Sequence, residues 1–353
     1  MKLTEIETPA LVVDLDEVEY NIAAMKELLK DSDAALRPHF KTSKSVCLAK
    51  MQMAAGAKGM TCAKLSEAEV LAEAGIPDIL IANQVVQPSK LNRLAFLAKK
   101  TRLTVCVDDA GNIAALEKAA EAADSLVHVY IEYEMGMNRC GVETPEEVLG
   151  LAEQIRACSH LSFDGIQAYA GWLSHEEDEN FRKEKAEEAQ ERLRVLKAFL
   201  EQRGIGVKEI SGCSTGTVQY KARGGIYTEL QCGSYLLSDT SYQDCKVLFH
   251  NALYLLSTVV SRKADRLILD VGVKGMGMDQ KQPRVLKYPK SILTFSEEHL
   301  ALSGEDYEEK RGDQLLVVPG HCCTTMNLYD TLYLKRGDEV LEKIAIEGRG
   351  KSI

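Results

Sequence analysis

The chain has 353 residues, of which 45% are hydrophobic and 27% are charged, and its formal net charge is -10 at pH 7. This acidic balance argues against nucleic acid or an anionic membrane as the main partner, because both attract basic surfaces. No apolar run is long enough for a membrane span, and the opening MKLTEIETPA carries acids where a signal peptide needs an apolar core, so we expect a cytoplasmic protein whose ten cysteines are reduced.

Eight predicted strands alternate with helices over residues 9–244. The strands are expected at 35–41, 59–64, 78–83, 102–108, 126–134, 161–169, 209–214 and 228–235. Apolar residues spaced at three and four, often after a Ser or Thr followed by Glu, predict helices at 66–75, 144–155 and 176–204. This alternation predicts an α/β domain with a TIM-like (β/α)8 barrel.

From residue 245 the pattern changes to short β-rich runs separated by Gly, Pro and charged turns. No helical pattern separates these runs, so residues 245–353 are predicted to form a second, mostly antiparallel β domain. Residues 1–8 either join this domain or lead into the barrel.

Polar residues recur where the predicted barrel strands end. They are Lys41, Asn83, Asp108, Glu134 and Tyr169. Because the chemistry of this fold sits at the carboxyl ends of the strands, we expect these side chains to converge on one mouth. The alternative for each is a buried side chain whose hydrogen bonds are satisfied within the core.

The fifth strand has an unusually polar inner face. Its residues predicted to face the barrel centre are His128, Tyr130, Glu132 and Glu134.

Lys41 is the strongest candidate for catalysis. In an extended RPHFKTSK (37–44), Arg37, His39 and Lys41 share one face. Burial and neighbouring cations would lower the pKa of Lys41, and its free amine would then form a Schiff base. The alternative is a solvated surface lysine. Lys44 is a weaker candidate, since it lies beyond the predicted strand.

A Schiff-base lysine suggests pyridoxal 5'-phosphate (PLP), which needs a phosphate site. SGCSTGT (211–217) follows the seventh strand and QCGSY (231–235) ends the eighth. Glycines with flanking hydroxyls let backbone amides approach a phosphate, and the loops after strands seven and eight are its usual place in this barrel.

A set of segments in chain order resembles the D-serine dehydratase and D-threonine aldolase family. The segments are TPALVVDLDEVEYNI (8–22), RPHFKTSK (37–44), MGMNRCGV (135–142), GIQAYAG (165–171), SGCSTGT (211–217), TELQCGSYLLSD (228–239), LDVGVKGMGMD (269–279), SEEH (296–299) and VPGHCCTTMNL (318–328). The resemblance implies an alanine-racemase-like fold of PLP fold type III, a homodimer, and Lys41 as the lysine bonded to the cofactor.

The resemblance also implies roles for individual residues. Lys41, Tyr169 and Arg139 would be catalytic, with Arg139 beside the cofactor ring or its 3-oxygen and Gln167 and Tyr169 beside the ring or the substrate. The residues expected around the phosphate are Thr215, Gly216, Thr217, Gly233, Ser234 and Tyr235.

His321 and Cys323 are the candidate metal ligands. Cys and His are ligands that zinc prefers, and residues two apart on an extended segment can face one ion, whereas Cys322 would face away. The alternative is a turn with a core histidine and small buried thiols. In the resembled family this position corresponds to a metal site, and His-x-Cys resembles its zinc dehydratase branch, since the aldolase branch tends to carry His-x-Asp.

Three functions follow from these expectations. The preferred one is a PLP- and zinc-dependent D-serine dehydratase, which converts D-serine into pyruvate and ammonia by zinc-assisted loss of the β-hydroxyl. The alternative is a D-threonine aldolase-type lyase, which would release glycine and an aldehyde. The third is a PLP-binding protein without turnover, against which the β domain and the His-x-Cys pair argue.

Overall fold

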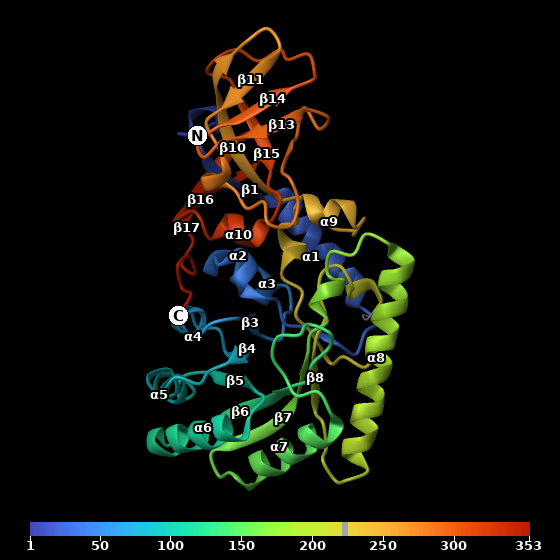
Figure 1. Cartoon of the computed structure of the whole chain (residues 1–353). Helices are drawn as coiled ribbons and strands as arrows, with labels where there is room; N and C mark the ends of the chain where they lie inside the picture. The colour runs from blue at the N-terminus through green and yellow to red at the C-terminus, as the bar shows by residue number, and fades with distance from the viewer. Residues whose placement is uncertain (221–224) are drawn as a thin grey trace. The chain divides into compact units, whose positions relative to one another are not determined.

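The structure, a computed structural model, describes residues 1–220 and 225–353 and divides into two compact units (Figure 1). One unit comprises Met1–Met25, Thr42–Cys47 and Ser234–Gly350, and the other comprises Lys26–Lys41, Leu48–Gly233 and Lys351–Ile353. We call them the β unit and the barrel unit. The predicted boundary between the barrel domain and the β domain, at residues 244 and 245, stays a prediction.

The barrel unit contains a parallel sheet in the order β2-β9-β8-β7-β6-β5-β4-β3. Its strands are β2 (Ala35–Leu36), β3 (Met60–Cys62), β4 (Asp78–Gln84), β5 (Arg102–Val107), β6 (Val127–Glu132), β7 (Leu161–Ala168), β8 (Glu209–Gly212) and β9 (Glu229–Leu230). A bridge between His39 and Thr61 connects the segment after β2 to β3, at the other end of this order. The predicted α/β barrel class is therefore confirmed.

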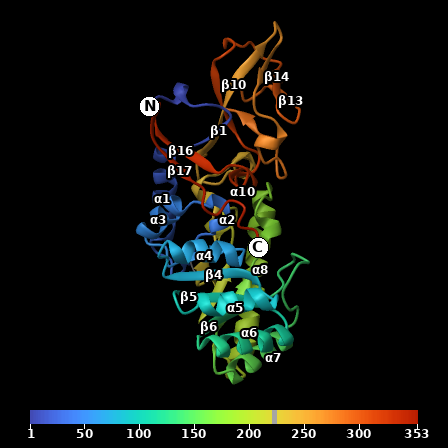
Figure 2. The ribbon, with the colours of Figure 1, turned by 90° about the vertical axis from the view of Figure 1, so that its left-hand side faces the viewer.

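Helices follow the strands, and Figure 2 shows α4, α5, α6 and α7 in succession along one side of the sheet. The helices that lie wholly in the barrel unit are α4 (Leu65–Glu73), α5 (Pro88–Leu97), α6 (Ala110–Ala123), α7 (Pro145–Ala157) and α8 (Glu179–Glu201). Their starts follow from local chemistry. Thr144 and Glu147 form a capping box before α7, and Asp178 accepts backbone N–H bonds at the start of α8.

The predicted strand at 35–41 is wrong beyond Leu36. The ladder continues only through Arg37 N–H to Leu230 and Thr61 N–H to the Pro38 carbonyl, after which residues Phe40–Ser43 form the short helix α2. Proline has no N–H to donate to a ladder, so the extended pairing ends there. Lys41 therefore lies on a helical turn, and the sharing of one strand face with Arg37 does not hold.

Three helices include residues of both units. They are α1 (Leu15–Leu29), α2 (Phe40–Ser43) and α3 (Val46–Ala54).

The β unit is a mostly antiparallel sheet with the path β13-β14-β11-β10-β1-β16-β17, to which β15 and β12 are attached through β10. Its strands are β1 (Ala10–Asp14), β10 (Leu253–Arg262), β11 (Arg266–Leu269), β12 (Arg284–Val285), β13 (Ile292–Phe295), β14 (Leu300–Ser303), β15 (Gln314–Val318), β16 (Thr331–Arg336) and β17 (Glu339–Ala345). The strand β1 pairs antiparallel with β10 and parallel with β16. The β class of this segment is confirmed.

The expectation that no helix interrupts the β-rich runs is wrong. Residues Cys322–Met326 form the short helix α10, and Thr240–Asp244 form α9 just before the sheet. His321 is the extended residue before α10, and its carbonyl oxygen accepts bonds from the hydroxyl and N–H of Thr325. These local bonds replace strand pairing at this segment.

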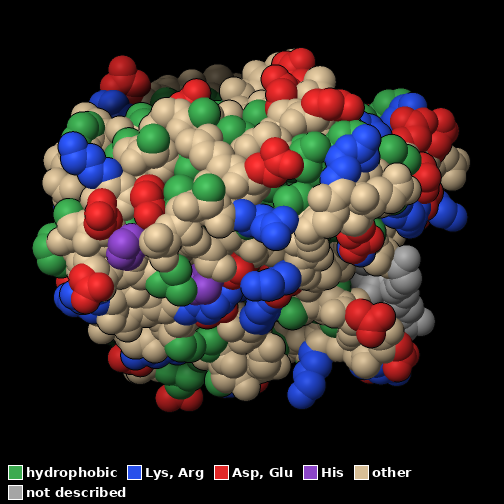
Figure 3. Space-filling model, turned by 90° about the horizontal axis from the view of Figure 1, so that it is seen from below, with side chains coloured by type: hydrophobic (Ala, Val, Ile, Leu, Met, Phe, Trp, Pro, Cys, Tyr) green, Lys and Arg blue, Asp and Glu red, His purple; other side chains and the backbone are tan. Residues whose placement is uncertain are grey.

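Figure 3 shows the face seen from below, where acidic and basic side chains are interspersed instead of gathering by sign. Within the described ranges, no helix combines the length and the apolar composition that a bilayer crossing demands.

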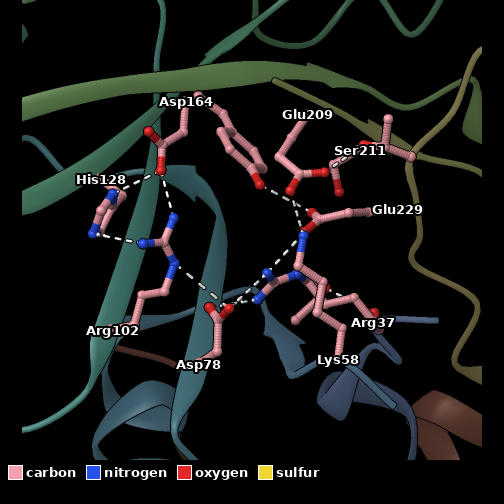
Figure 4. Close-up of polar contacts among 12 residues, drawn as sticks. Arg37, Lys58, Asp78, Arg102, His128, Asp164, Glu209, Ser211 and Glu229 are labelled. Atoms are coloured by element: carbon pink, nitrogen blue, oxygen red, sulfur yellow. Dashed lines mark hydrogen bonds and ion pairs between the residues drawn. The ribbon is translucent and has the colours of Figure 1, made fainter. Parts of the chain in front are cut away.

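A network of charged side chains fills the amino end of the barrel (Figure 4). Arg37, whose side chain is 1% exposed, donates to Asp78 at 2.9 Å and to Glu229 at 2.8 Å. Glu229 also receives the Lys58 ammonium at 2.7 Å and the Tyr130 hydroxyl at 3.1 Å. Because Asp78 and Glu229 begin β4 and β9, the network lies at the face of this fold that serves stability, not chemistry.

We expect Arg37→Gln to destabilise the protein by about 3–5 kcal/mol, because it leaves the fully buried Glu229 with much less compensating charge. Burial raises the pKa of Glu229, yet Arg37 and Lys58 together outweigh burial and hold that pKa below its usual value. Urea unfolding measures the change. The matched control is Arg93→Gln, which breaks an exposed pair with Glu69 and should cost no more than about 1 kcal/mol. Equal losses in the two variants would contradict the role of burial.

Candidate active site

A cavity of about 120 Å³ lies at the carboxyl ends of the barrel strands. The residues that line it are His39, Lys41, Ala63, Ala82, Asn83, Arg139, Gln167, Tyr169 and Gln231. All belong to the barrel unit. Five of the residues predicted from the sequence, Lys41, Asn83, Arg139, Gln167 and Tyr169, are thus brought together from different segments, as expected for chemistry at this end of the fold.

Lys41 enters the cavity from α2, and its Nζ lies 5.8 Å from the centroid of the Tyr169 ring. The backbone N–H of Lys41 lies 3.4 Å from Nδ1 of His39, which also lines the cavity. Arg37 is not among the lining residues, and its guanidinium is bound by Asp78 and Glu229. The argument that Arg37 lowers the pKa of Lys41 therefore loses its basis.

Arg139 reaches the cavity from the loop that follows β6. The Glu134 carboxylate accepts the N–H groups of Gly136 at 2.7 Å and of Asn138 at 2.8 Å, as well as that of Met137. Burial raises the pKa of Glu134, but these N–H donors outweigh it and leave that pKa below its usual value. Glu134 therefore shapes the loop and does not line the cavity.

The same loop is held at two further points. Gly141 donates its N–H to Asp108 at 2.8 Å, and Trp172 donates its indole N–H to the Met135 carbonyl at 2.9 Å. Gly136 and Gly141 have φ values of 91° and 103°, which glycine adopts without strain. Asp108, predicted to point into the mouth, thus acts as an anchor of the loop that carries Arg139.

The Arg139 guanidinium faces both an aromatic ring and an acid. Its Cζ lies 6.0 Å from the Tyr169 ring centroid, and Nη2 lies 3.4 Å from Oε1 of Glu132, the last residue of β6. Glu132 accepts a second bond from Gln84 Nε2 at 2.7 Å. Burial raises the pKa of Glu132, even though Gln84 and Arg139 lower it.

The side chains on the inner face of β6 have two different roles. Tyr130 is bound to Glu229, and His128 Nδ1 lies 2.7 Å from Asp164, so both are satisfied within the barrel interior. Glu132 instead pairs with Arg139, which lines the cavity.

Gln231 is a cavity residue that the sequence does not single out. Its Nε2 donates to Gln167 Oε1 at 2.5 Å and to Ser211 Oγ at 2.9 Å. Gln231 directly follows β9 and precedes the small residues Cys232 and Gly233. A polar side chain at this strand end is the sequence signal that could have identified it.

The loop after β8 is compact around Thr215. The Thr217 hydroxyl lies 3.1 Å from Ser214 Oγ, and Thr217 N–H donates to the Ser214 carbonyl at 3.1 Å. A Cβ added to Gly216 would overlap the Ser174 carbonyl oxygen, so this position requires glycine. Thr215 Oγ1 is buried and has no hydrogen-bond partner within the described part of the chain.

The other predicted phosphate residues follow β9. Gly233 ends the barrel unit, and Ser234 and Tyr235 begin the turn Ser234–Leu236 in the β unit. The Tyr235 ring is buried against Phe249, with centroids 5.4 Å apart.

The His321–Cys323 pair lies in the β unit at the start of α10. His321 Nδ1 lies 2.7 Å from Asp279 Oδ2, and Cys323 Sγ lies 3.3 Å from the hydroxyl of Thr42. Burial lowers the pKa of His321, but Cys323 and Asp279 outweigh it and raise the pKa to about 9. A histidine whose Nδ1 is fixed by a carboxylate presents Nε2 to a ligand, which is the usual arrangement around a bound metal.

This pair supplies only two of the three or four ligands that a zinc site needs. In residues 1–220 and 225–353, no three His, Cys, Asp or Glu side chains gather into a group able to hold a metal ion. Cys322 is fully buried, its backbone N–H donates to Asp239 at 2.9 Å, and its Sγ lies 4.0 Å from the Cys323 Sγ.

Comparison with protein families gives two matches. Residues 13–241 match the family described as alanine racemase, N-terminal domain, and residues 252–335 match a putative serine dehydratase domain.

Similarity to individual proteins extends over the whole chain. A 3-hydroxy-D-aspartate aldolase of Paracoccus denitrificans (strain Pd 1222) is 37% identical, with 99% of this chain and 94% of that protein covered. The structure of D-threonine aldolase from Filomicrobium marinum superposes with a TM-score of 0.97 at 34% identity, covering 100% of this chain and 98% of that one.

A third similar protein carries information on the metal pair. A D-threo-3-hydroxyaspartate dehydratase was solved as a cysteine-to-alanine mutant in a metal-free form, with a TM-score of 0.87, 26% identity, and 97% and 98% of the chains covered. The same enzyme was solved as a histidine-to-alanine mutant, and the histidine stands two positions before the cysteine. This is the spacing of His321 and Cys323.

Proposed function

This chain belongs to the alanine racemase N-terminal domain family, and from that premise we propose that it is a PLP-dependent lyase that cleaves D-3-hydroxy amino acids to glycine and an aldehyde. The observation that carries the proposal is the convergence of Lys41, Arg139 and Tyr169 on one cavity at the catalytic end of the barrel. Full-length similarity to two aldolases supports this reaction over D-serine dehydration, which the sequence alone favours. The full-length relatives are enzymes, which argues against a PLP-binding protein without turnover.

The residues present fit PLP. Lys41 would hold it covalently, and the loop around Thr215 offers a buried hydroxyl that has no hydrogen-bond partner among the described residues, together with a glycine that no side chain can replace. A phosphate is the kind of acceptor that would satisfy such a hydroxyl. When bound, PLP supplies an electron sink that stabilises negative charge at the substrate Cα.

The chain's own residues would move and position charge in this cavity. Retro-aldol cleavage leaves a glycine carbon that must take up a proton, and Lys41 Nζ is the cavity amine placed to deliver it. The Tyr169 hydroxyl lies 3.2 Å from Ser174 Oγ, which fixes the ring that Lys41 and Arg139 both face. Arg139 would keep a positive charge beside the cofactor.

A divalent metal, for which zinc is our expectation, would be held by His321 and Cys323 with Asp279 orienting the histidine. The donor set supports this, because histidine and thiolate are ligands of zinc, and substrate and water would complete the shell. When bound, such an ion supplies a Lewis acid for the substrate hydroxyl. Cys323 contacts Thr42, which directly follows Lys41 in the chain.

Thr215→Val is expected to weaken PLP binding about tenfold, because a hydrogen bond to a charged phosphate is lost. The same substitution should leave the apoprotein as stable as before, or more stable, since it removes a buried hydroxyl that no residue of 1–220 or 225–353 satisfies. Fluorescence titration of the apoprotein with PLP and thermal unfolding measure the two effects. Thr217→Val is the contrast, because Thr217 bonds with Ser214 and its loss should lower apoprotein stability. Unchanged PLP affinity in Thr215→Val would argue against this loop as the phosphate site.

A second candidate is dehydration of a D-3-hydroxy amino acid. One observation favours it: the His-x-Cys spacing of this chain is also found for the mutated residues of the similar dehydratase. Lys41 Nζ would then remove the proton from Cα, and the products would be ammonia and a 2-oxo acid.

The deciding experiment is product analysis with D-threonine, D-3-hydroxyaspartate and D-serine, with and without a chelator. An aldolase releases glycine and acetaldehyde from D-threonine, whereas a dehydratase releases 2-oxobutanoate and ammonia. Formation of oxo acids without glycine would overturn the aldolase proposal. The homodimer remains a prediction, which sedimentation analysis would test.

A further inference from the structure

We propose that Glu132 is a positioning residue for Arg139, a cavity residue with which it forms a single ion pair. The inference rests on the proposed function, because it concerns the same cavity. Its residues are nevertheless defined by contacts within the barrel unit alone.

The exposed fractions of the two side chains indicate that Glu132 is the fixed partner and Arg139 the mobile one. The Glu132 side chain is 6% exposed and stands at the end of β6, whereas the Arg139 side chain is 47% exposed and is carried by a loop. A long arginine side chain on a loop has many accessible rotamers, and pairing with a rigid carboxylate at 3.4 Å restricts them. Glu132 thus acts on the guanidinium and not on the reacting atoms.

Gln84 explains why Glu132 itself is held in one orientation. The β4–β5 pairing shifts register between Ile81 and Gln84, and Gln84 Nε2 then donates to Glu132 Oε2 at 2.7 Å. With Oε2 engaged in this way, Oε1 is the oxygen that meets Arg139. Gln84 Oε1 is buried without a hydrogen-bond partner in the described residues, so the amide serves as a donor here at a cost in stability.

The charges of Glu132 and Arg139 stabilise each other. Glu132 lies in a buried and acidic setting, where both desolvation and Asp108 oppose its ionisation, and Arg139 is the cation that counters them. Removing either charge leaves the other in an unfavourable environment. The guanidinium is therefore expected to stay over Tyr169 only while Glu132 carries its charge.

The test uses Glu132→Gln in the PLP-loaded enzyme, because glutamine keeps the shape and the Gln84 contact but removes the charge. We expect kcat/KM to fall about 10- to 100-fold, the range found when the partner that orients an active-site group is lost, mainly through kcat. The visible absorption band of the bound cofactor should shift, because the charge beside it moves. Glu132→Asp should recover part of the activity and move the band back.

A double-mutant cycle separates positioning from general structural support. In an Arg139→Ala background, Glu132→Gln should have no further effect on kcat/KM or on the absorption band, since the group through which Glu132 acts is gone. The proposal would be overturned if the losses of kcat/KM in the two single variants multiplied in the double variant. It would also be overturned if the absorption band were unchanged in Glu132→Gln. The matched control is Glu69→Gln, which removes a carboxylate paired with Arg93 on the outer helices and should change neither readout.

A second variant and a readout other than activity keep the test decisive. If Glu132→Gln fails to fold, Gln84→Leu removes the donor that orients the carboxylate and should shift the band in the same direction by a smaller amount. If no D-3-hydroxy amino acid is cleaved, the proposed function fails, yet the absorption band still reports whether Glu132 positions Arg139 beside PLP.

Discussion

Replacement of Lys41 by alanine is expected to remove the covalent attachment of PLP and to lower kcat by at least about 10²- to 10⁴-fold, the contribution of a positioned proton-transfer group. Lys41 is the lysine that lines the cavity, and its Nζ faces the Tyr169 ring. Visible absorbance of the purified protein measures the attachment. Borohydride reduction followed by peptide mass analysis identifies the lysine that carries the cofactor.

The control for this substitution is Lys50→Ala, which removes an exposed lysine in the middle of α3. It should retain the chromophore and full activity. A reduced peptide labelled at a lysine other than Lys41 would contradict the assignment of the whole cavity. Recovery of activity in Lys41→Ala by added methylamine would support the role of the amine in proton transfer.

The barrel strands could be predicted because their signal is local. Buried strands such as 102–108 and 161–169 are short apolar runs bounded by turns, and β5 and β7 lie there. The turn from β2 into α2 could not be predicted in this way. Its four helical residues follow a proline, and nothing in the apolar spacing of 37–44 distinguishes a strand end from a short helix.

Strand ends and the family resemblance predicted several cavity residues, but neither predicted the path of the loop after β6. Arg139, Gln167 and Tyr169 line the cavity as the family resemblance implies. Glu134 was expected to point into the mouth, but the N–H groups of the following loop bind its carboxylate instead. The path of that loop depends on left-handed residues and on tertiary contacts, which no periodicity reports.

The contact between Glu132 and Gln84 could likewise be predicted only in part. Glu132 belongs to the inner face predicted for the fifth strand, so its direction follows from alternation. Its pairing with Gln84 depends on a register shift between β4 and β5, which is a property of two strands together. A single sequence therefore indicates that a buried acid is present, but not what it positions.

Removal of the metal is the other change with a large expected effect. A Lewis acid on the substrate hydroxyl contributes several kcal/mol, so chelation or Cys323→Ala should lower kcat by about 100-fold or more. The PLP chromophore should persist, because no PLP-holding residue is changed. Elemental analysis should find one divalent ion per chain in the unmodified protein and almost none in Cys323→Ala or His321→Ala.

The neighbouring thiol provides the matched control for this prediction. Cys322 is fully buried, so Cys322→Ala should lower stability slightly by removing a packed thiol, while the metal content and the activity remain. Asp279→Asn should have an intermediate effect, because it weakens the partner that orients His321 without removing a ligand. If Cys323→Ala kept both its ion and its activity while Cys322→Ala lost them, the metal would have to be bound through the buried thiol, and the short helix α10 would have to open to allow it.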